Sequence, residues 1–405
     1  MRRLLAVLPD HPQPLDMGSR VRNVRILEAL SSQFELCIVS LVHRREHLDA
    51  PGPVAELGTW VPVLAPHRRN RASHLATHLR SRLSGMTEGL HRETFFMSFP
   101  ELSDEVRRQL ESFRPDIVHV AYWYALRHLE ARPRPPLWVV DTHDVQFERH
   151  ERLWGRVSPR EKAAELLELS RYDRVIAITG HDRDVFRSEL GPSLECAVMP
   201  MGVDTDSWSP DAVAPSRGDA PRVVFYGNMT NESNQVAARH LLDDVVPLVR
   251  ADVPGLEVTL LGAGTPDDLR AAAAENETPV LVTGFVEDVR PHLSSGRVLA
   301  LSLQSGSGQR GRVVEALALG VPVVGYRGGL EGLEFEDGEG VVIVDDELRF
   351  AEELTRLLQH PDAARELGLA GRAAVVERYG MDATYGRFPR VYREWLESIE
   401  ASAEG

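Results

Sequence analysis

The sequence predicts two α/β domains, each built on a doubly wound parallel sheet. Short runs rich in Val, Ile and Leu alternate with longer amphipathic stretches, as expected for parallel strands that crossover helices bury on both faces. The chain has 405 residues, whereas single cores stop growing near ~250 to 300 residues. Residues 203–221 contain three prolines and lack an apolar period, which is typical of a linker.

The expected strands form two sets, one on each side of this linker. The first set is 4–8, 35–40, 60–64, 117–121, 138–141, 174–178 and 196–199, and the second is 222–226, 257–261, 280–283, 298–303, 322–324 and 341–344. We therefore expect a first domain over 1–204, a linker over 205–220 and a second domain over 221–382. Apolar residues at helical spacing predict a last helix within 382–399.

Composition excludes several classes of protein. The 46 basic and 61 acidic residues give a net charge of -15, which argues against nucleic acid as the main partner. Cys37 and Cys196 are too few for a disulfide framework and lie in apolar stretches, so we expect inert thiols. The apolar run at the N-terminus breaks at Pro9, short of a signal peptide or a membrane span. A cytoplasmic enzyme is the expectation.

One basic stretch stands apart from this acidic background. Residues 67–83 interleave arginines with Leu75, Leu79 and Leu83. A basic amphipathic helix of this kind suits a peripheral membrane contact or an acidic acceptor, and a solvated helix is the alternative.

A loop with glycines and arginines follows the expected strand 298–303. Gly306, Gly308 and Gly311 let a backbone approach a ligand closely, and the helix that begins after them offers unpaired amides to an anion. Arg310 and Arg312 add fixed positive charges, so the loop predicts a diphosphate site rather than a solvated basic turn. Glu315, near the start of that helix, is suited to vicinal hydroxyls such as those of a ribose, or else is an exposed helical carboxylate.

Polar residues also follow strands elsewhere. His143 follows the expected strand 138–141, with Asp141 and Asp144 near it to orient an imidazole or bind hydroxyls. His119 lies in another such strand, and a structural histidine is the alternative for both. Gly227 and Asn228, and Gly18 in the first half, are loop residues at carboxyl ends of strands, where open sheets bind ligands; simple tight turns are the alternative. The spacing of His and carboxylate residues predicts no metal site.

Taken together, these segments resemble the family-4 retaining glycosyltransferases of GT-B fold over essentially the whole chain. The segments that carry the resemblance, by their order and spacing, are Arg114 to His119, Asp141 to Asp144, Asp173 to Ile178, Pro200 to Asp204, Phe225 to Met229, Gly284 to Asp288 and Glu315 to Val324. The resemblance implies two Rossmann-like domains facing across a cleft, with a C-terminal helix, 383–405, that crosses back to an acceptor-binding N-terminal domain.

The resemblance also implies roles for single residues. The main chain at Phe285 and Val286 would hold the base, Glu315 the ribose, and the loop from Ser307 through Gly308, Gln309, Arg310, Gly311 and Arg312 the diphosphate and sugar. Gly18 would lie beside the diphosphate, with Gly227 and Asn228 in the donor site. His143 would support the reaction with Arg310 and Arg312, and Asp141, Asp144 and His119 would contact the acceptor.

This sequence departs from the family pattern at two places. Ser307 stands where the family often has a first glutamate, seven intervening residues before Glu315, and no basic pair follows Gly227. The run Gly308-x-Arg310-x-Arg312 resembles a branch with Gly-x-Arg-x-Lys there, so we expect its arginines to hold the diphosphate.

The expected reaction moves a sugar, with retention, from a UDP- or GDP-linked donor to a small-molecule, glycan or lipid-linked acceptor, without a cofactor or metal. The alternatives are an epimerase-like enzyme that modifies the nucleotide sugar and a non-catalytic sugar-nucleotide-binding protein. We expect a monomer or a homodimer, and the sequence leaves the donor base, the sugar and the acceptor open.

Overall fold

The computed structural model divides the chain into two compact units, which confirms the prediction of two parallel α/β domains. The first unit comprises Met1–Pro200 and Tyr385–Gly405, and the second comprises Met201–Thr384. The structure describes residues 1–15, 17–68, 71–87, 91–133, 136–155, 158–214, 220–304 and 308–404. Within these ranges, every helix is too short or too polar to traverse a lipid bilayer.

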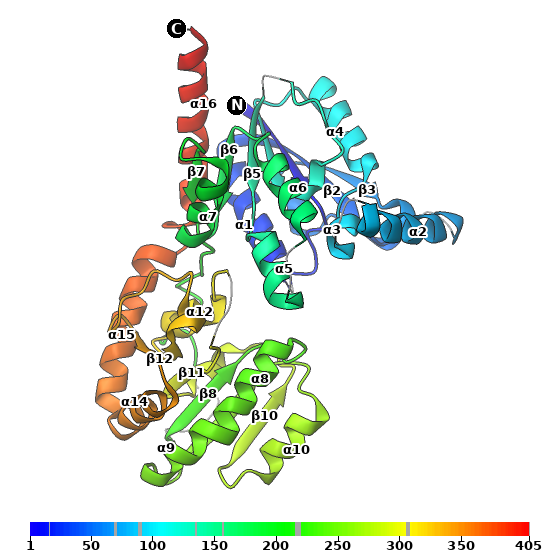
Figure 1. Ribbon diagram of the computed structural model, residues 1–405. Helices are drawn as coiled ribbons and strands as arrows, with labels where there is room; N and C mark the ends of the chain where they lie inside the picture. Colours follow the sequence, from blue (N-terminus) through cyan, green and yellow to red (C-terminus); the bar gives the residue numbers. More distant parts are fainter. Residues whose placement is uncertain are drawn as a thin grey trace. The chain divides into compact units, whose positions relative to one another are not determined.

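The first unit is built on a seven-stranded parallel sheet with the order β3-β2-β1-β4-β5-β6-β7. Helices flank the sheet (Figure 1). The strands are β1 Arg2–Leu8, β2 Phe34–Val42, β3 Thr59–Leu64, β4 Ile117–Ala121, β5 Leu137–Asp141, β6 Arg174–Ala177 and β7 Cys196–Val198. The helices are α1 Gly18–Ser31, α2 Arg71–Thr87, α3 Arg92–Phe96, α4 Pro100–Ser112, α5 Gln146–Trp154, α6 Pro159–Leu169, α7 Gly180–Leu190 and α16 Phe388–Glu404.

The second unit holds a six-stranded parallel sheet with the order β10-β9-β8-β11-β12-β13. Its strands are β8 Arg222–Tyr226, β9 Glu257–Leu261, β10 Val280–Gly284, β11 Val298–Leu301, β12 Val323–Tyr326 and β13 Val341–Val344. Its helices are α8 Glu232–His240, a π-helical turn η5 Leu241–Val245, α9 Val246–Asp252, α10 Asp267–Glu275, α11 Arg290–Ser294, α12 Gly311–Ala318, α13 Arg327–Leu330, α14 Glu347–Gln359 and α15 Pro361–Tyr379. Short 3₁₀ turns complete the first unit: η1 Arg45–His47, η2 Gly52–Glu56, η3 Pro66–Arg68, η4 Trp123–Leu126 and η6 Tyr385–Arg387.

All thirteen expected strands form. The central strands are apolar runs buried on both faces of their sheets, whereas the edge strands β3, β7 and β10 are only partly buried. In the central strands, Leu4 to Leu8 and Val298 to Leu301, for example, are each at most 1% exposed. The strand order reverses direction between β1 and β4 in the first sheet and between β8 and β11 in the second. Open α/β sheets bind ligands outside the carboxyl ends of the strands at such switch points.

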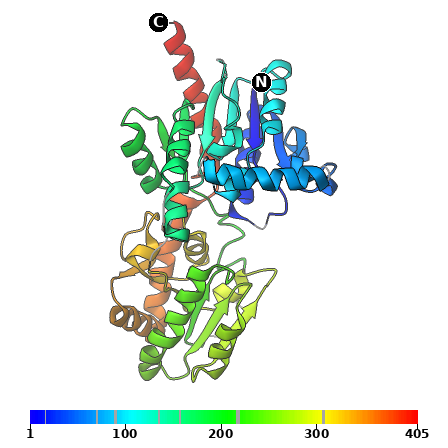
Figure 2. The ribbon, with the colours of Figure 1, turned by 45° about the vertical axis from the view of Figure 1, so that its right-hand side comes forward.

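The division between the units falls earlier in the chain than the proline-rich composition suggested. Residues 201–214 belong to the second unit, where Val203 donates its amide to Tyr379 O at 2.8 Å and Val213 joins the core. At the other end, α16 belongs to the first unit and contacts α1 (red helix in Figures 1 and 2). Apolar side chains on one face of α16, Phe388 and Tyr392 among them, are buried there.

Candidate active site

The arginine loop of the second unit lies at the switch point of its sheet. β11 ends at Leu301. After the undescribed residues 305–307, Gly308 has a φ of +69°, and α12 begins at Gly311 with Arg310 as its N-cap residue. The first amides of a helix have no partner within the helix and favour an anion. Ser307 lies outside the described residues.

Arg312 points back across the end of β8. Its Nη1 donates to the Tyr226 carbonyl at 2.7 Å and to Asn234 Oδ1 at 3.1 Å, and Asn234 in turn donates to the Asn228 carbonyl at 2.7 Å. A Cβ atom at position 227 would meet Arg312 Nη1 at 2.6 Å, so this packing requires Gly227. The predicted residues Gly227, Asn228 and Arg312 therefore lie together, although Arg312 is braced by protein oxygens rather than held free.

Glu315 lies on the same helix and faces Tyr226. Burial raises the pKa of Glu315 to about 7, while a hydrogen bond with the Tyr226 side chain and the charge of Arg312 oppose that rise. The carboxyl group therefore titrates near neutral pH, and its protonation decides whether it accepts hydrogen bonds at both oxygens or donates from one.

The side chain of Gln309 bonds within the second unit. Its Oε1 accepts from the Met201 amide and its Nε2 donates to the Met201 carbonyl, both at 2.7 Å. Because both ends of the side-chain amide are occupied, Gln309 anchors the start of the unit, and the geometry does not support donor binding by its side chain.

The expected base-binding segment follows β10. Gly284 has a φ of +66°, and the next residue, Phe285, has 78% of its surface exposed. Val286 is half-buried and packs against the core. An exposed aromatic face suits stacking on a planar group.

In the first unit, Gly18 is the first residue of α1 and is exposed beyond the carboxyl end of β1. Gly18 and His143 thus follow strands of the same sheet, β1 and β5, which lie on either side of β4.

His143 occupies a tightly packed position just after β5. Its φ is +62°, unusual for a residue with a side chain, and its ring stacks on that of Tyr122 with centroids 4.1 Å apart and planes 16° apart. Burial lowers the pKa of His143 to about 4, with Asp141 acting to raise it and Arg22 to lower it further. The imidazole is therefore neutral at pH 7.

Two of the three predicted acceptor contacts, Asp141 and His119, are buried and bonded within the domain. Asp141 is fully buried, and its two oxygens accept from Arg22 Nε at 2.8 Å and Nη2 at 3.0 Å. His119 is 1% exposed, and its Nδ1 lies 2.7 Å from the Tyr392 hydroxyl of α16. Because both side chains are used inside the domain, the structure does not support acceptor binding by Asp141 or His119.

Asp144 remains partly accessible. It accepts from Gln146 Nε2 at 2.7 Å, and burial raises its pKa to about 6 against the charge of Arg149.

Sequence reasoning missed Arg22, Tyr122, Tyr226 and Asn234. Arg22 had a usable signal, because it precedes Ile26 and Leu30 at helical spacing and so stands in the buried stripe of α1. The others are ordinary strand-end or helix residues whose roles depend on partners far along the chain.

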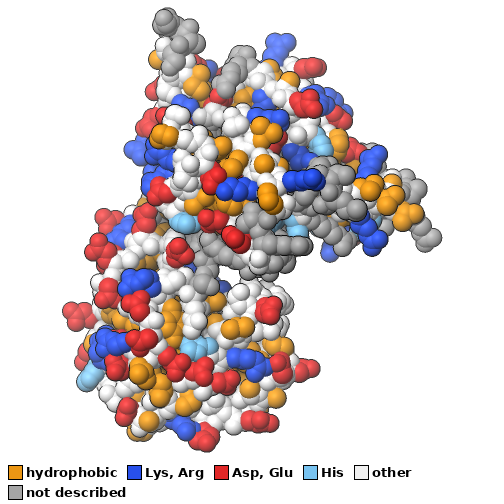
Figure 3. All heavy atoms as spheres, in the orientation of Figure 1, with side chains coloured by type: hydrophobic (Ala, Val, Ile, Leu, Met, Phe, Trp, Pro, Cys, Tyr) orange, Lys and Arg blue, Asp and Glu red, His pale blue; other side chains and the backbone are white. Residues whose placement is uncertain are grey.

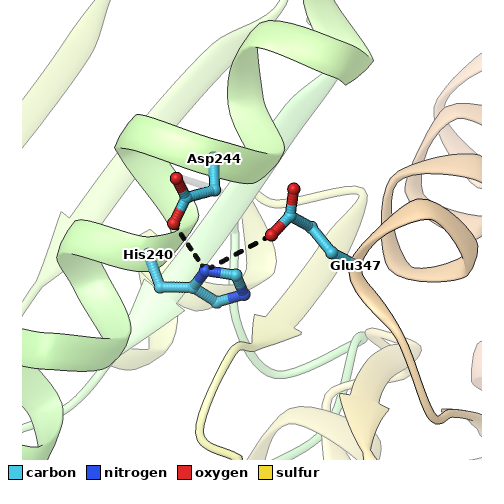
Figure 4. A group of neighbouring side chains, drawn as sticks. All are labelled: His240, Asp244 and Glu347. Atoms are coloured by element: carbon cyan, nitrogen blue, oxygen red, sulfur yellow. Dashed lines mark hydrogen bonds and ion pairs between the residues drawn. The ribbon is translucent and has the colours of Figure 1, made fainter.

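A group that could hold a metal occurs away from these positions, in the described part of the second unit. His240 Nδ1 lies 2.8 Å from Asp244 Oδ2 and 3.9 Å from Glu347 Oε2 (Figure 4). Its Nε2 lies 2.7 Å from the Tyr326 hydroxyl, so both ring nitrogens have protein partners. That the reaction needs no metal stays a prediction.

Comparison with known proteins matches each half of the chain to a glycosyltransferase family. Residues 25–207 match the family described as Glycosyltransferase Family 4, and residues 220–360 match Glycosyl transferases group 1. A GDP-mannose-dependent alpha-(1-6)-phosphatidylinositol monomannoside mannosyltransferase of Mycolicibacterium smegmatis is 30% identical over 220 residues, 49% of this chain and 56% of that protein. A glycogen synthase of Mycobacterium tuberculosis is 27% identical over 69% of each chain.

Solved structures share the fold across nearly the whole chain. A sucrose-phosphate synthase from Thermosynechococcus elongatus superposes with a TM-score of 0.72 at 16% identity, covering 98% of this chain and 100% of that one. The Anabaena protein HepE in complex with UDP and glucose superposes with a TM-score of 0.67 at 13% identity over the same shares. The match to the mannosyltransferase spans little more than half of that relative's length.

Proposed function

Since the chain belongs to the glycosyltransferases of GT-B fold, we propose that it transfers a sugar from a nucleoside-diphosphate sugar to an acceptor, with retention of the anomeric configuration. The second domain binds the donor and the first domain binds the acceptor. The name of the mannosyltransferase relative, which includes GDP-mannose and a phosphatidylinositol glycolipid, favours a GDP-linked donor and a lipid-linked acceptor. The UDP and glucose bound to HepE make UDP-glucose the second donor to test.

The donor proposal rests mainly on the switch point between β8 and β11. There the start of α12, Arg310 and the braced guanidinium of Arg312 gather positive potential beside the polar turn at Gly227. A diphosphate suits this arrangement because helix amides and guanidinium groups donate in fixed directions to its oxygens.

The chemistry follows from the same charges. As the bond to the sugar breaks, negative charge grows on the leaving diphosphate, and donors already aimed at it stabilise that charge without reorganisation. The departing phosphate oxygen then takes the acceptor's proton on the same face of the sugar. Neutral His143 acts by hydrogen bonding, since its low pKa makes it a poor general acid at pH 7.

A thermal-shift screen tests the donor class. A ligand at ~100 times its dissociation constant adds ~2.7 kcal/mol of stability. GDP, UDP and their sugars should therefore raise the melting temperature, with GDP-mannose and UDP-glucose as the key pair. A protein that no nucleotide stabilises would refute the assignment of the arginine loop.

Product analysis separates the alternatives. A transferase releases the nucleotide and, without acceptor, slowly hydrolyses its donor, whereas an epimerase changes the sugar while it stays linked. A protein that binds donor but yields neither product would be a sugar-nucleotide-binding protein.

The acceptor proposal rests on α2. Leu75, Leu79 and Leu83 follow one another at four-residue spacing and are 51% to 73% exposed, and Arg80 and Arg82 are exposed beside them. Hydrophobic and basic side chains lie together on this helix (Figure 3). This pattern suits the surface of an anionic membrane in which a lipid-linked acceptor resides.

Vesicle sedimentation checks this surface. The wild-type protein should sediment with vesicles that contain anionic phospholipid and lose that binding when Leu79 is changed to Glu. Changing Leu348, a leucine of the second domain that is 65% exposed, to Glu is the matched control. Equal binding by all three proteins would exclude α2 as the membrane contact.

A further inference from the structure

A buried polar network lies directly behind His143. Arg22 of α1 is fully buried and grips both oxygens of Asp141 at the end of β5, at 2.8 and 3.0 Å. The Phe388 ring of α16 lies 5.8 Å from the guanidinium carbon. Three segments far apart in the sequence therefore meet at one ion pair.

This ion pair is a costly way to stabilise a fold. Desolvating two charges offsets much of their attraction, and well-packed apolar residues often serve as well. Nη1 of Arg22 is also buried, and no described residue offers it a hydrogen bond. Buried polar atoms without partners are rare enough in native proteins to need an explanation.

Backbone strain gathers at the same place. The described residues include three non-glycine residues with positive φ, and two of them, Tyr122 and His143, stack on each other here. Residues held in sparsely populated backbone regions cluster at functional sites, where the surrounding structure enforces them. The network and the strain together point to a role in positioning His143.

The two ring nitrogens of His143 have different surroundings. His143 Nε2 is buried, has no hydrogen-bond partner among the described residues and lies 3.4 Å from Asp141 Oδ2. A carboxylate on that side favours a proton on Nε2, because the opposite tautomer would set a lone pair against a negative oxygen. Nδ1, on the other edge of the ring, is then a hydrogen-bond acceptor.

We infer that Arg22 and Asp141 are positioning residues that hold His143 as its Nε2–H tautomer, so that Nδ1 accepts a hydrogen bond from the bound substrate. The inference deepens the proposed function and rests on it for the identity of the substrate. Arg22 keeps Asp141 ionised although burial opposes this, and the Tyr122 ring fixes the plane of the imidazole. The charged and titratable groups that act on His143 are Asp141, Arg22 and His119.

Nitrogen NMR of the free protein tests the tautomer. In protein labelled with ¹⁵N-histidine, long-range proton–nitrogen spectra distinguish a protonated from an unprotonated ring nitrogen, and His143→Gln assigns the signal. At pH 7 His143 should carry its proton on Nε2. A proton on Nδ1 would overturn the inference, whatever reaction the enzyme performs.

Substitutions at the ion pair should act in opposite directions. Arg22→Met leaves Asp141 without its cation, so the pKa of His143 should rise by about one unit or more. Asp141→Asn removes the attraction, so that pKa should fall and the tautomer preference should weaken. Loss of packing alone would not give opposite signs, and shifts of the same sign would refute the electrostatic role.

A double variant keeps the inference testable if the single variants fail to fold. Arg22→Met/Asp141→Leu removes both charges and should fold, because apolar replacement of a whole buried pair is often tolerated. Its His143 should lose the tautomer preference, and kcat should fall about tenfold while KM changes less than twofold. The control, Arg2→Met, breaks a half-exposed pair with Asp116 in the same domain and should leave the His143 signal unchanged.

The two proposals fail separately. If the double variant keeps the Nε2–H tautomer of the wild type, the positioning role is refuted even in an active transferase. If the tautomer changes as expected but the wild-type protein neither binds nor turns over any nucleotide sugar, only the proposed function is refuted.

Discussion

Two glycine-to-alanine substitutions in the second domain should separate folding from ligand binding. A Cβ at position 227 would lie 2.6 Å from Arg312 Nη1 and 3.1 Å from the Asn234 amide group. Contacts below 3.0 Å do not persist, so Gly227→Ala must displace the guanidinium from the Tyr226 carbonyl. A hydrogen bond to a charged group contributes about 1.5–3 kcal/mol, and overpacking costs about 1–3 kcal/mol, so we expect a loss of about 2–3 kcal/mol.

Gly311→Ala is the substitution to compare with Gly227→Ala. A Cβ at position 311 has no protein atom within 4 Å, and the residue starts α12 without a positive φ. Stability should therefore stay constant or rise by about 0.4–1 kcal/mol through the lower entropy of the unfolded chain. If the diphosphate rests against this helix start, however, the added methyl group should weaken donor binding at least tenfold.

Urea unfolding and nucleotide titration measure both effects. Gly227→Ala should lower the free energy of unfolding and weaken binding, whereas Gly311→Ala should weaken binding alone. Wild-type stability in Gly227→Ala would refute the packing argument. Undiminished nucleotide binding in Gly311→Ala would refute the place assigned to the diphosphate.

Three further outcomes follow from the charges of the site. The pKa of Glu315, about 7, lies above the ~4.3 of an unfolded glutamate, so the folded state holds the proton more tightly. This contribution to the free energy of unfolding is present below pH ~4.3 and is lost as the pH rises to about 7. Urea unfolding at pH 5 and pH 8 should show this decline in the wild type and not in Glu315→Gln. Arg310→Ala should reduce donor binding by about 10- to 100-fold, as loss of a charged hydrogen bond does, and unchanged affinity in calorimetry would contradict its role. Because the pKa of His143 is about 4, its titration should cause no change in kcat/KM between pH 6 and 7, and the pH profiles of the wild type and His143→Gln should have the same shape there. Turnover in His143→Gln should nevertheless fall roughly 10²-fold or more.

The sequence predicted the strands well because burial in a sheet requires a short continuous run of apolar residues. A central strand of a parallel sheet is covered on both faces and is therefore apolar along its length. Runs such as Leu4 to Leu8 can thus be recognised from the local sequence alone. The start of α12 was also predictable, because glycines and arginines precede it and apolar residues at helical spacing follow it. Such features depend on neighbours in the sequence.

The partners of polar side chains were not predictable in this way. Asp141 and His119 end or occupy strands, as ligand-binding residues do, yet the structure pairs them with Arg22 and Tyr392, 119 and 273 residues away. Gln309 likewise bonds to Met201, 108 residues earlier. A side chain's availability depends on what else packs against it, and no local pattern contains that information.

Two doubly wound sheets and the segments at their carboxyl ends could be read from local pattern, because hydrophobic period and turn residues are properties of neighbouring positions. Folding set which of the polar groups bond to one another, as Asp141 does to Arg22 and Gln309 does to Met201. The physical reason is that the free energy of a buried charge depends on partners that folding brings together, as it brings Arg22 to Asp141 behind His143 and Arg312 to the Tyr226 carbonyl.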